Sequence, residues 1–237
     1  MADGVGAQEN NMRNIQSHVA TVRWSANGDV VAEKRPVNIP VAISSGHVHL
    51  TQAVIEQLFC DRYRLHDRSA LVQRQEFSAE ETVTLIGPGG RLRNVRVLGP
   101  PRSVNQIEIT RTDALALGIK APVRESGDLI GTPGVILQGP RTQVTLGTGV
   151  ICPLRHIHMN PADAERLALA DGDRVEVSTE GHNRRLVFQD VLVRVFPDHQ
   201  LELHLDTDEA NAAGLYAGDY ATLHTIRSSA PDRATNQ

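Results

Sequence analysis

The sequence predicts a mainly β protein, built from two related β-barrel domains that are capped by short α-helices. Three observations support this prediction. Apolar residues occur in short alternating runs bounded by Gly, Pro and Asp, which is typical of strands and turns. Aromatic residues make up only 3% of the 237 residues, so the core must consist mainly of Val, Ile, Leu and Ala. The two halves of the chain also carry similar motifs in the same order.

The N-terminal segment, residues 1–36, is polar and precedes the first strand signal. Met12, Ile15, Val19 and Val22 have helical spacing within it. Two interpretations stay open at this point. One is a frayed terminus with a helical turn or two, and the other is a short amphipathic docking helix followed by a linker.

Ten runs after this segment are predicted to form strands. They are VNIPVAI, ETVTLIG, RLRNVRVLG, NQIEIT, GVILQG, GVICPL, DRVEVS, RLVFQDVLVRV, QLELHL and YATLHTI. The sequence Pro88-Gly89-Gly90 between the second and third runs predicts a hairpin turn.

Four short helices are expected between the strands. Thr51 is a suitable N-cap for one of them, and Asn160 is a suitable N-cap for another, with Pro161 at the first helical position. The two other helices are expected to end at Gly118 and Gly214.

Each half of the chain contains a His-x-His motif followed by an N-cap and a short helix. His47 and His49 form the first pair, and His156 and His158 form the second. Residues i and i+2 of an extended segment point to the same side, so each pair can bind one ion. A single His-x-His pair is more often a set of surface or core histidines, but two pairs at equivalent places favour metal binding.

The duplication also indicates a third ligand for each pair. When Gly118 is aligned with Gly214, Glu108 falls on His204. Both residues alternate with apolar neighbours and should therefore leave the core face of their strands. The alternatives are a solvated strand carboxylate and an exposed strand histidine. Three ligands with one open position are typical of catalytic zinc, with cobalt, nickel or iron as weaker candidates.

Further candidates lie in loops rich in Gly and Pro. Arg102, or Arg124 near Ser126, could clamp a phosphate group beside two metals, although a loop arginine is often only a surface charge. Phe77 is either a core anchor or a stacking platform for a base.

Composition excludes several classes of function. The net charge is −4 and the 24 basic residues are scattered, which argues against binding of duplex nucleic acid. Cys60 and Cys152 could form at most one disulfide. We expect a cytoplasmic protein without a membrane anchor, because no signal peptide or long apolar run is present.

The chain resembles the PduL-type phosphate propanoyltransferase family from residue 37 to about residue 226. The motifs that carry the resemblance are SSGHVHLT, FSAEETVTLIGPGG, VRVLGPPRSVNQIEITRTDA, APVRESGDL, RHIHMNPADAERL, FQDVLVRV and LELHLDTDEANAAG. Ser45-Gly46 departs from the bulkier or polar residues of many relatives. The resemblance implies two barrels, with residues 37–46 joining the C-terminal one, residues 47–150 forming the first unit, residues 151–226 the second, and residues 227–237 a tail.

The resemblance also implies a site with two zinc ions. Its ligands would be His47, His49, Glu108, His156, His158 and His204. Arg102 would handle phosphate and Ser126 would border that pocket. Phe77 would contact the adenine of coenzyme A, with His204 and Asn211 as further contacts to coenzyme A.

The expected reaction converts propanoyl-CoA, or another short acyl-CoA, and phosphate into acyl phosphate and CoA. Phosphate would attack the thioester directly at the two zinc ions. The alternatives are a dizinc hydrolase and a non-catalytic metal-binding scaffold protein of a microcompartment. The resemblance further suggests propanediol degradation inside a bacterial microcompartment, residues 12–22 as a targeting peptide, shell proteins as partners, and a homodimer.

Overall fold

The computed structural model divides the chain into two units, residues 1–37 and residues 38–237. The residues that it describes are 21–24, 30–33, 36–71 and 76–224. In the first unit, β1 (Thr21–Trp24) and β2 (Val30–Glu33) pair antiparallel.

The helix expected near the N-terminus does not reach Val22, because this residue lies in the extended strand β1. Met12, Ile15 and Val19 lie outside the described residues.

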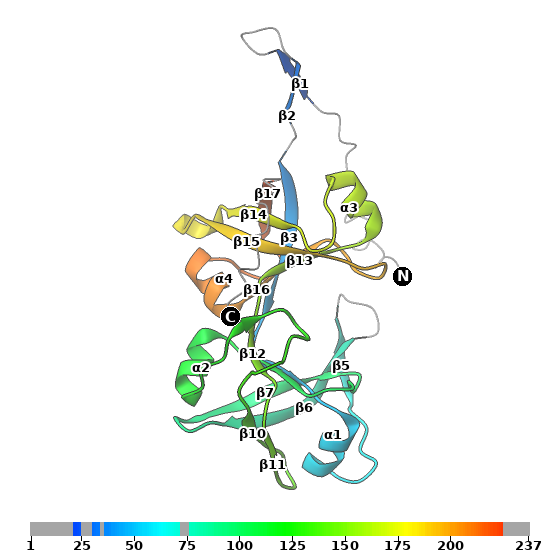
Figure 1. The fold of residues 1–237 in the computed structure, drawn as a ribbon, viewed down its shortest axis with the longest axis vertical. Helices are drawn as coiled ribbons and strands as arrows, with labels where there is room; N and C mark the ends of the chain where they lie inside the picture. Colours follow the sequence, from blue (N-terminus) through cyan, green and yellow to red (C-terminus); the bar gives the residue numbers. More distant parts are fainter. Residues whose placement is uncertain (1–20, 25–29, 34–35, 72–75, 225–237) are drawn as a thin grey trace, which may run out of the picture. The chain divides into compact units, whose positions relative to one another are not determined.

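The second unit is mainly β, as predicted, and contains two sheets (Figure 1). The first is an open sheet whose strands are β11 (Gln143–Leu146), β10 (Val135–Gln138), β6 (Phe77–Ile86), β7 (Arg91–Gly99), β4 (His47–His49), β8 (Gln106–Glu108), β12 (Val150–Pro153), β9 (Val123–Arg124) and β5 (Asp67–Ala70), the last pairing with β6. The second is a closed barrel of β13 (His156–Met159), β15 (Leu186–Val195), β14 (Arg174–Thr179), β17 (Tyr220–His224), β3 (Val37–Ser44) and β16 (Glu202–Asp206).

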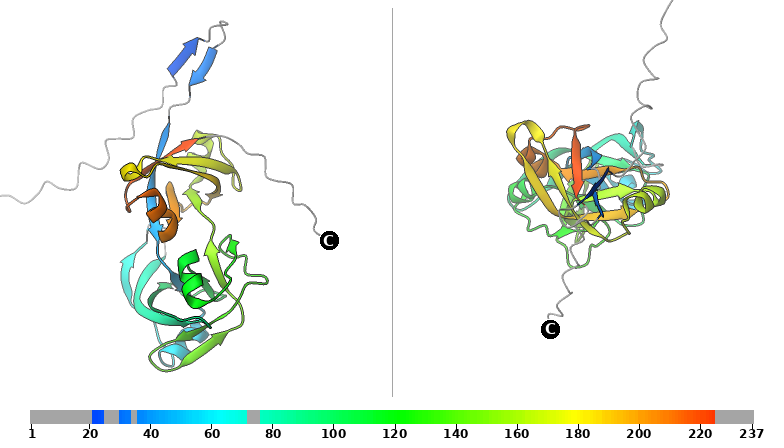
Figure 2. Two further views of the ribbon diagram at one scale, coloured as in Figure 1. Left: turned by 90° about the vertical axis from the view of Figure 1, so that its left-hand side faces the viewer. Right: turned by 90° about the horizontal axis from the view of Figure 1, so that it is seen from above.

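The two barrel-like units predicted from the sequence are present: one sheet is a closed barrel, and the other is a curled half-barrel. Within the described residues, the hydrogen-bonded path of the first sheet runs from β11 to β9 without closing. Figure 2 shows the barrel from two further directions, with β17 in red beside β3 in blue. The ten predicted strands are all present, and Pro88-Gly89-Gly90 links β6 to β7, where the Gly87 N–H donates to the Gly90 carbonyl at 3.0 Å.

The four predicted helices are present with the expected caps. They are α1 (Gln52–Leu58), α2 (Arg111–Leu117), α3 (Pro161–Leu167) and α4 (Thr207–Ala213), and a 3₁₀ turn, η1, covers Gly181–Asn183. Thr51 and Asn160 accept backbone N–H groups in the first turns of α1 and α3. Gly118 and Gly214 end α2 and α4 with φ of 68° and 64°, a conformation that costs glycine little.

Two strands cross between the halves of the chain. β3 directly precedes β4 but pairs with β16 and β17 of the barrel. β12 directly precedes β13 but pairs with β8 and β9 of the open sheet. Each His-x-His strand therefore begins immediately after a strand that belongs to the other sheet.

Each sheet encloses an aliphatic core, as the low aromatic content predicts. Val48, Ile55 and Leu85 are fully buried in the first, and Ile157 and Leu203 are fully buried in the second. Removing one such side chain from water stabilises a fold by about 1.5–3 kcal/mol. These rigid cores hold the strands that carry the candidate ligands.

Cys60 is exposed and Cys152 is buried, and both are free thiols. Among the described residues, every helix is too short or too polar to pass through a bilayer.

Candidate metal centre

The first candidate metal site lies where β4 meets β8. The two strands are antiparallel, so His47 lies opposite Glu108 and His49 lies opposite Gln106. The donor atoms of His47, His49 and Glu108 all lie within 4.8 Å of one another. His47 Nε2 is 3.3 Å from Glu108 Oε2. The expected third ligand therefore joins the first histidine pair in space.

Glu108 is held by two neutral donors rather than exposed to water. Only 8% of the Glu108 surface is exposed. Gln106 Nε2 and Ser126 Oγ each donate to Glu108 Oε1 at 2.6 Å. Burial by itself would raise the pKa of this carboxyl, but the charge and hydrogen bond of His47 and the Ser126 hydroxyl outweigh burial and hold the pKa well below its usual range. Ser126, expected beside phosphate, here supports Glu108.

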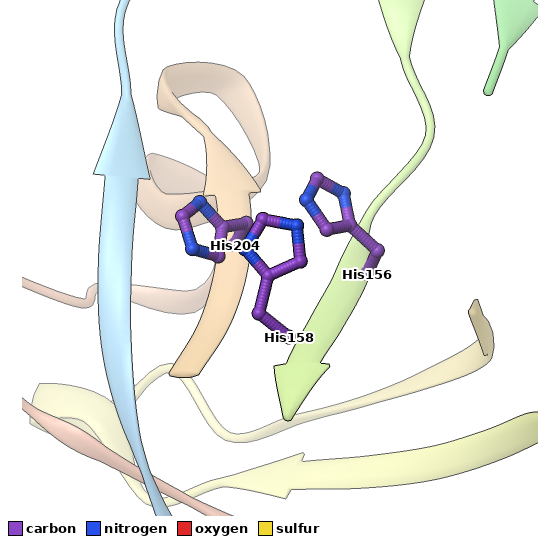
Figure 3. A group of neighbouring side chains, drawn as sticks. All are labelled: His156, His158 and His204. Atoms are coloured by element: carbon purple, nitrogen blue, oxygen red, sulfur yellow. The ribbon is translucent and has the colours of Figure 1, made fainter. Parts of the chain in front are cut away.

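The second candidate site has the same construction on β13 and β16. His156 lies opposite His204, and His158 lies opposite Glu202. The donor atoms of His156, His158 and His204 also lie within 4.8 Å of one another. Figure 3 shows the three rings turned into the space between the two strands. The rings of His156 and His204 are stacked, with centroids 5.0 Å apart.

Backbone carbonyls orient the first histidine of each pair. His47 Nδ1 is 2.9 Å from the Ser45 carbonyl, and His156 Nδ1 is 2.8 Å from the Leu154 carbonyl. A ring nitrogen that meets a carbonyl must donate, so the proton belongs on Nδ1. The Nε2 lone pair is then available, which is the usual arrangement for a metal-binding histidine.

Burial keeps most of these rings neutral. Desolvation, followed by nearby positive charge, lowers the pKa of His49 to about 3 and the pKa of His156 to about 4. The pKa of His158 is also lowered, first by burial and then by His156 and His204. His47 differs, because Glu108 outweighs burial and raises its pKa. Neutral imidazole is the form that binds a cation, so His156 and His158 are ready for an ion at pH 7.

His204 has a close contact that does not satisfy it. Its Nε2 lies 2.9 Å from Glu202 Oε2, yet this buried nitrogen forms no hydrogen bond. The two atoms are close enough for a hydrogen bond, but a hydrogen bond also requires a suitable angle. A buried polar atom without a partner costs about 1–3 kcal/mol, which a bound cation would offset.

The two groups of ligands influence each other, and Arg102 lies near the first. The negative charge of Glu108 raises the pKa of His156, while burial, the largest effect, lowers it. Arg102 Nη2 donates to Glu76 Oε1 at 2.7 Å. Its charge contributes to lowering the pKa of His49, behind the larger effects of burial and His47.

Three other expected residues, Phe77, Arg124 and Asn211, make no contact with the candidate ligands in the described part of the chain. The Phe77 ring packs over Gly99, where a Cβ would come within 2.2 Å of it. The Arg124 side chain is half-exposed, and its Nη1 lies 3.5 Å from Asp128 Oδ2. Asn211 is exposed on α4.

Sequence reasoning missed several residues near the ligands. Gln106 and Glu202 lie two positions before the third ligands, so strand periodicity alone could have found them. Glu76, which accepts a hydrogen bond from Arg102, and Arg194, which lies opposite His158 across β13 and β15, had no distinguishing pattern. His199 lies in the turn between β15 and β16, with its ring centroid 3.9 Å from that of His158.

The donor sets fit zinc. Imidazole nitrogen and one carboxylate are common zinc ligands, whereas calcium and magnesium prefer sets made of oxygen atoms. A divalent ion in each group would neutralise Glu108 in one and satisfy His204 Nε2 in the other.

Comparisons with known proteins identify similar chains. The model of the family described as phosphate propanoyltransferase matches residues 40–216. A phosphate propanoyltransferase of Citrobacter rodentium is 53% identical over 84% of this chain and 94% of its own length. Proteins of the same name from Klebsiella pneumoniae and Thermotoga maritima are 52% and 50% identical, over 83% and 78% of this chain and 93% and 89% of their own lengths.

Proposed function

The chain belongs to the phosphate propanoyltransferase family and is an acyltransferase, and we propose that it transfers a short acyl group between coenzyme A and phosphate at a centre of two zinc ions. Propanoyl is the acyl group that the names of its relatives favour. The observation that carries the proposal is the pair of three-donor groups at equivalent places of a duplicated fold.

Zinc would be held by the two groups already described. His47, His49 and Glu108 would bind one ion, and the second ion would be bound by His156, His158 and His204. Bound zinc supplies a Lewis acid that polarises an oxygen and offsets the negative charge of the oxyanion and of the departing thiolate.

In the proposed reaction a phosphate oxygen attacks the thioester carbonyl. A new carbon–oxygen bond forms, the carbon–sulfur bond breaks, and coenzyme A leaves as a thiolate that takes a proton from solvent. Neither Cys60 nor Cys152 is needed as a nucleophile. Burial raises the pKa of the Cys152 thiol to about 11, which keeps it protonated and unreactive.

Arg102 is proposed to orient phosphate. Its planar guanidinium can grip two phosphate oxygens at once, and its charge reduces the repulsion between two anionic substrates. In the structure the guanidinium binds the Glu76 carboxylate at 2.7 Å. Phosphate would therefore compete with Glu76 for Arg102.

Ser126 and Gln106 are proposed to position Glu108. Both donate to its Oε1, which fixes the carboxylate with its second oxygen toward His47. Contacts of coenzyme A with Phe77, His204 and Asn211 are proposed from the resemblance.

The test combines metal analysis with a phosphate-dependent assay. The purified protein is expected to contain two zinc ions per chain and to release coenzyme A thiol from propanoyl-CoA only when phosphate is present. Hydroxylamine trapping should detect an equal amount of propanoyl phosphate. Equal thiol release without phosphate would instead indicate a hydrolase, and activity retained in metal-free protein would reject the zinc centre.

The N-terminal extension is proposed to direct the enzyme to a bacterial microcompartment of propanediol degradation, with shell proteins as partners. The family match begins only at residue 40, which leaves the preceding segment free for another role. The test is a fusion of residues 1–36 to a fluorescent protein, which should gather in shells when they are co-expressed. Diffuse fluorescence would reject this role.

A homodimer is the assembly expected in solution.

A further inference from the structure

The helices α2 and α4 begin directly after the strands that carry the third candidate ligands. Glu108 ends β8, and the N-cap of α2, Thr110, follows two positions later. His204 lies in β16, and the N-cap of α4, Asp206, also follows two positions later. Both N-caps form a capping box, in which side chains and backbone bind each other reciprocally. Each helix is therefore fixed to its strand, and a shift of the helix shifts the ligand.

A hydrogen bond links these two helices. The Thr112 backbone N–H in the first turn of α2 donates to Asp208 Oδ2, in the first turn of α4, at 2.8 Å. The helices lie next to each other in Figures 1 and 2, with α2 in green and α4 in orange. N–H groups in the first turn of a helix have no partner within that helix, so the Asp208 carboxylate satisfies a donor that α2 itself cannot satisfy.

This bond joins equivalent positions of the duplicated chain. The register that aligns Glu108 with His204 also aligns Thr112 with Asp208, since each lies four positions further on. The exchange of β3 and β12 between the halves is reciprocal, as in a two-fold relation. In such a relation a position meets its own equivalent only at the axis, where the two halves meet. The contact of Thr112 with Asp208 therefore lies where it can set the spacing of the two halves.

The bond depends on one side chain. Thr112 contributes only its backbone N–H, whereas Asp208 contributes the carboxylate that accepts it. Asp208 belongs to neither of the two groups of candidate metal ligands. A substitution of Asp208 therefore breaks the link between the helices and leaves all six candidate ligands in place.

We propose that Asp208 is a positioning residue, whose bond to α2 fixes the separation of Glu108 from His204 and thereby the separation of the two metal groups. This inference rests on the proposed zinc centre. In that centre both ions act on one pair of substrates, so their separation governs the rate of the reaction rather than the affinity for either ion. Misplacement of reacting groups by about 1 Å can lower a rate by about a hundredfold.

The experiment compares the wild type with two variants of Asp208. Asp208→Ala removes the acceptor, and Asp208→Asn removes the charge but keeps an oxygen that can accept the bond. Bound zinc is counted by titration of metal-free protein against a competing chelator, and kcat and the KM for phosphate are measured on the zinc-loaded protein. Electron paramagnetic resonance of copper-loaded protein gives the dipolar coupling between the two ions, which falls steeply with their separation.

Asp219→Ala is the matched control. Asp219 Oδ2 also accepts a backbone N–H at 2.8 Å, that of Tyr216, but this bond lies within the single turn that precedes β17. The control therefore removes a bond of the same kind and length without separating the two halves.

We expect Asp208→Ala to bind two zinc ions as tightly as the wild type, to show a changed dipolar coupling, and to lose roughly 10- to 100-fold in kcat with an unchanged KM for phosphate. Asp208→Asn should recover most of the coupling and most of kcat, because it restores the acceptor. Asp219→Ala should match the wild type in both measurements.

An unchanged coupling in Asp208→Ala would reject this inference, and so would an equal change in Asp219→Ala. Loss of one ion in Asp208→Ala would also reject it, because Asp208 would then support one ligand group instead of the separation of both. Equal losses in Asp208→Asn and Asp208→Ala would assign the effect to charge and reject the role of the bond. Fewer than two ions, or no coupling, in the wild type would reject the zinc centre itself. If Asp208→Ala fails to fold, Asp208→Ser provides the same comparison, because its side chain is one atom shorter.

Discussion

Replacing Glu108 by Gln tests the metal centre most directly, because it removes one charge and almost no volume. The carboxylate is buried and accepts hydrogen bonds from Gln106 and Ser126, so the amide can occupy the same space. The two effects to be measured are a loss of metal affinity at one site and a change in the stability of metal-free protein.

The loss of affinity follows from Coulomb's law. Two unit charges 4 Å apart interact by about 1 kcal/mol in bulk water, so a divalent ion at a typical ligand distance of about 2 Å gains about 4 kcal/mol from a carboxylate. Glu108→Gln should then weaken one zinc site by roughly a thousandfold, since about 1.4 kcal/mol corresponds to a factor of ten.

The effect on the metal-free fold should be smaller. Hydrogen bonds to a charged acceptor contribute about 1 kcal/mol more than bonds to a neutral one, so two weakened bonds predict a loss of about 2 kcal/mol in the free energy of unfolding. Urea unfolding of metal-free protein measures this value, and the circular dichroism spectrum should stay β-rich.

The assay is a zinc titration of metal-free protein with a competing chelator. Glu80→Gln is the control, because Glu80 is an exposed carboxylate in strand β6 of the same sheet, which does not pair with β8. His204→Ala should weaken the other site. Two full-strength sites in Glu108→Gln would mean that Glu108 is an ordinary strand carboxylate and that the reasoning from the duplication is wrong at this position.

Three further predictions concern other parts of the chain. Arg102→Lys should keep both ions but raise the KM for phosphate by roughly tenfold or more, because a point charge cannot grip two oxygens; an unchanged KM in steady-state assays would remove Arg102 from the site. Contact with Glu81 raises the pKa of His66 above 6.5 and the same contact lowers the pKa of Glu81 below 4.5, although burial opposes both shifts. The His66–Glu81 pair therefore stabilises the fold fully between about pH 4.5 and 6.5, and less as the pH rises through the raised pKa of His66 or falls through the lowered pKa of Glu81. Urea unfolding over a pH series should show the largest deficit of His66→Asn in that window, and a deficit independent of pH would contradict this. Deleting residues 1–33 should leave a folded and active enzyme, because every proposed ligand lies beyond them; loss of either in circular dichroism or activity assays would contradict the assignment of this segment as an extension.

Local signals in the sequence were sufficient for the secondary structure. Thr51 and Asn160 cap their helices because a side-chain oxygen satisfies backbone N–H groups that the helix cannot satisfy. Gly118 and Gly214 end helices because the left-handed backbone disfavours other residues. These causes act over a few residues, so they are visible without knowledge of the tertiary structure.

The duplication was sufficient to predict which side chains meet. The alignment of Glu108 with His204 came from residues several positions away, and the structure places the two residues opposite His47 and His156 in equivalent strand pairs. The sequence could not predict that Glu108 would be buried, because the partners that cover it, notably Ser126, come from a loop.

The position of His199 and the degree of closure of the first sheet could not be predicted for a related reason. His199 belongs to a turn, where no periodicity relates a side chain to a face, and its contact with His158 arises only when β15 and β16 take their places beside β13. Closure of a sheet depends on strand tilt and stagger, which alternating patterns do not encode.

The exchange of β3 and β12 explains why two metal groups on separate sheets lie near each other. Ala42 of β3 is paired with His204. Only five residues later the chain reaches His47 of β4, which belongs to the other sheet. In the second half, Ile151 is paired with Glu108, and five residues later the chain has reached His156. Five extended residues span at most about 18 Å, so the backbone limits the separation of the two groups twice over. The charge of Glu108 reaches His156, which agrees with a shorter separation. Because each half supplies a strand to the other, the paired ligand groups depend on both halves of the fold, and a single copy of the repeat could not assemble either sheet as it stands.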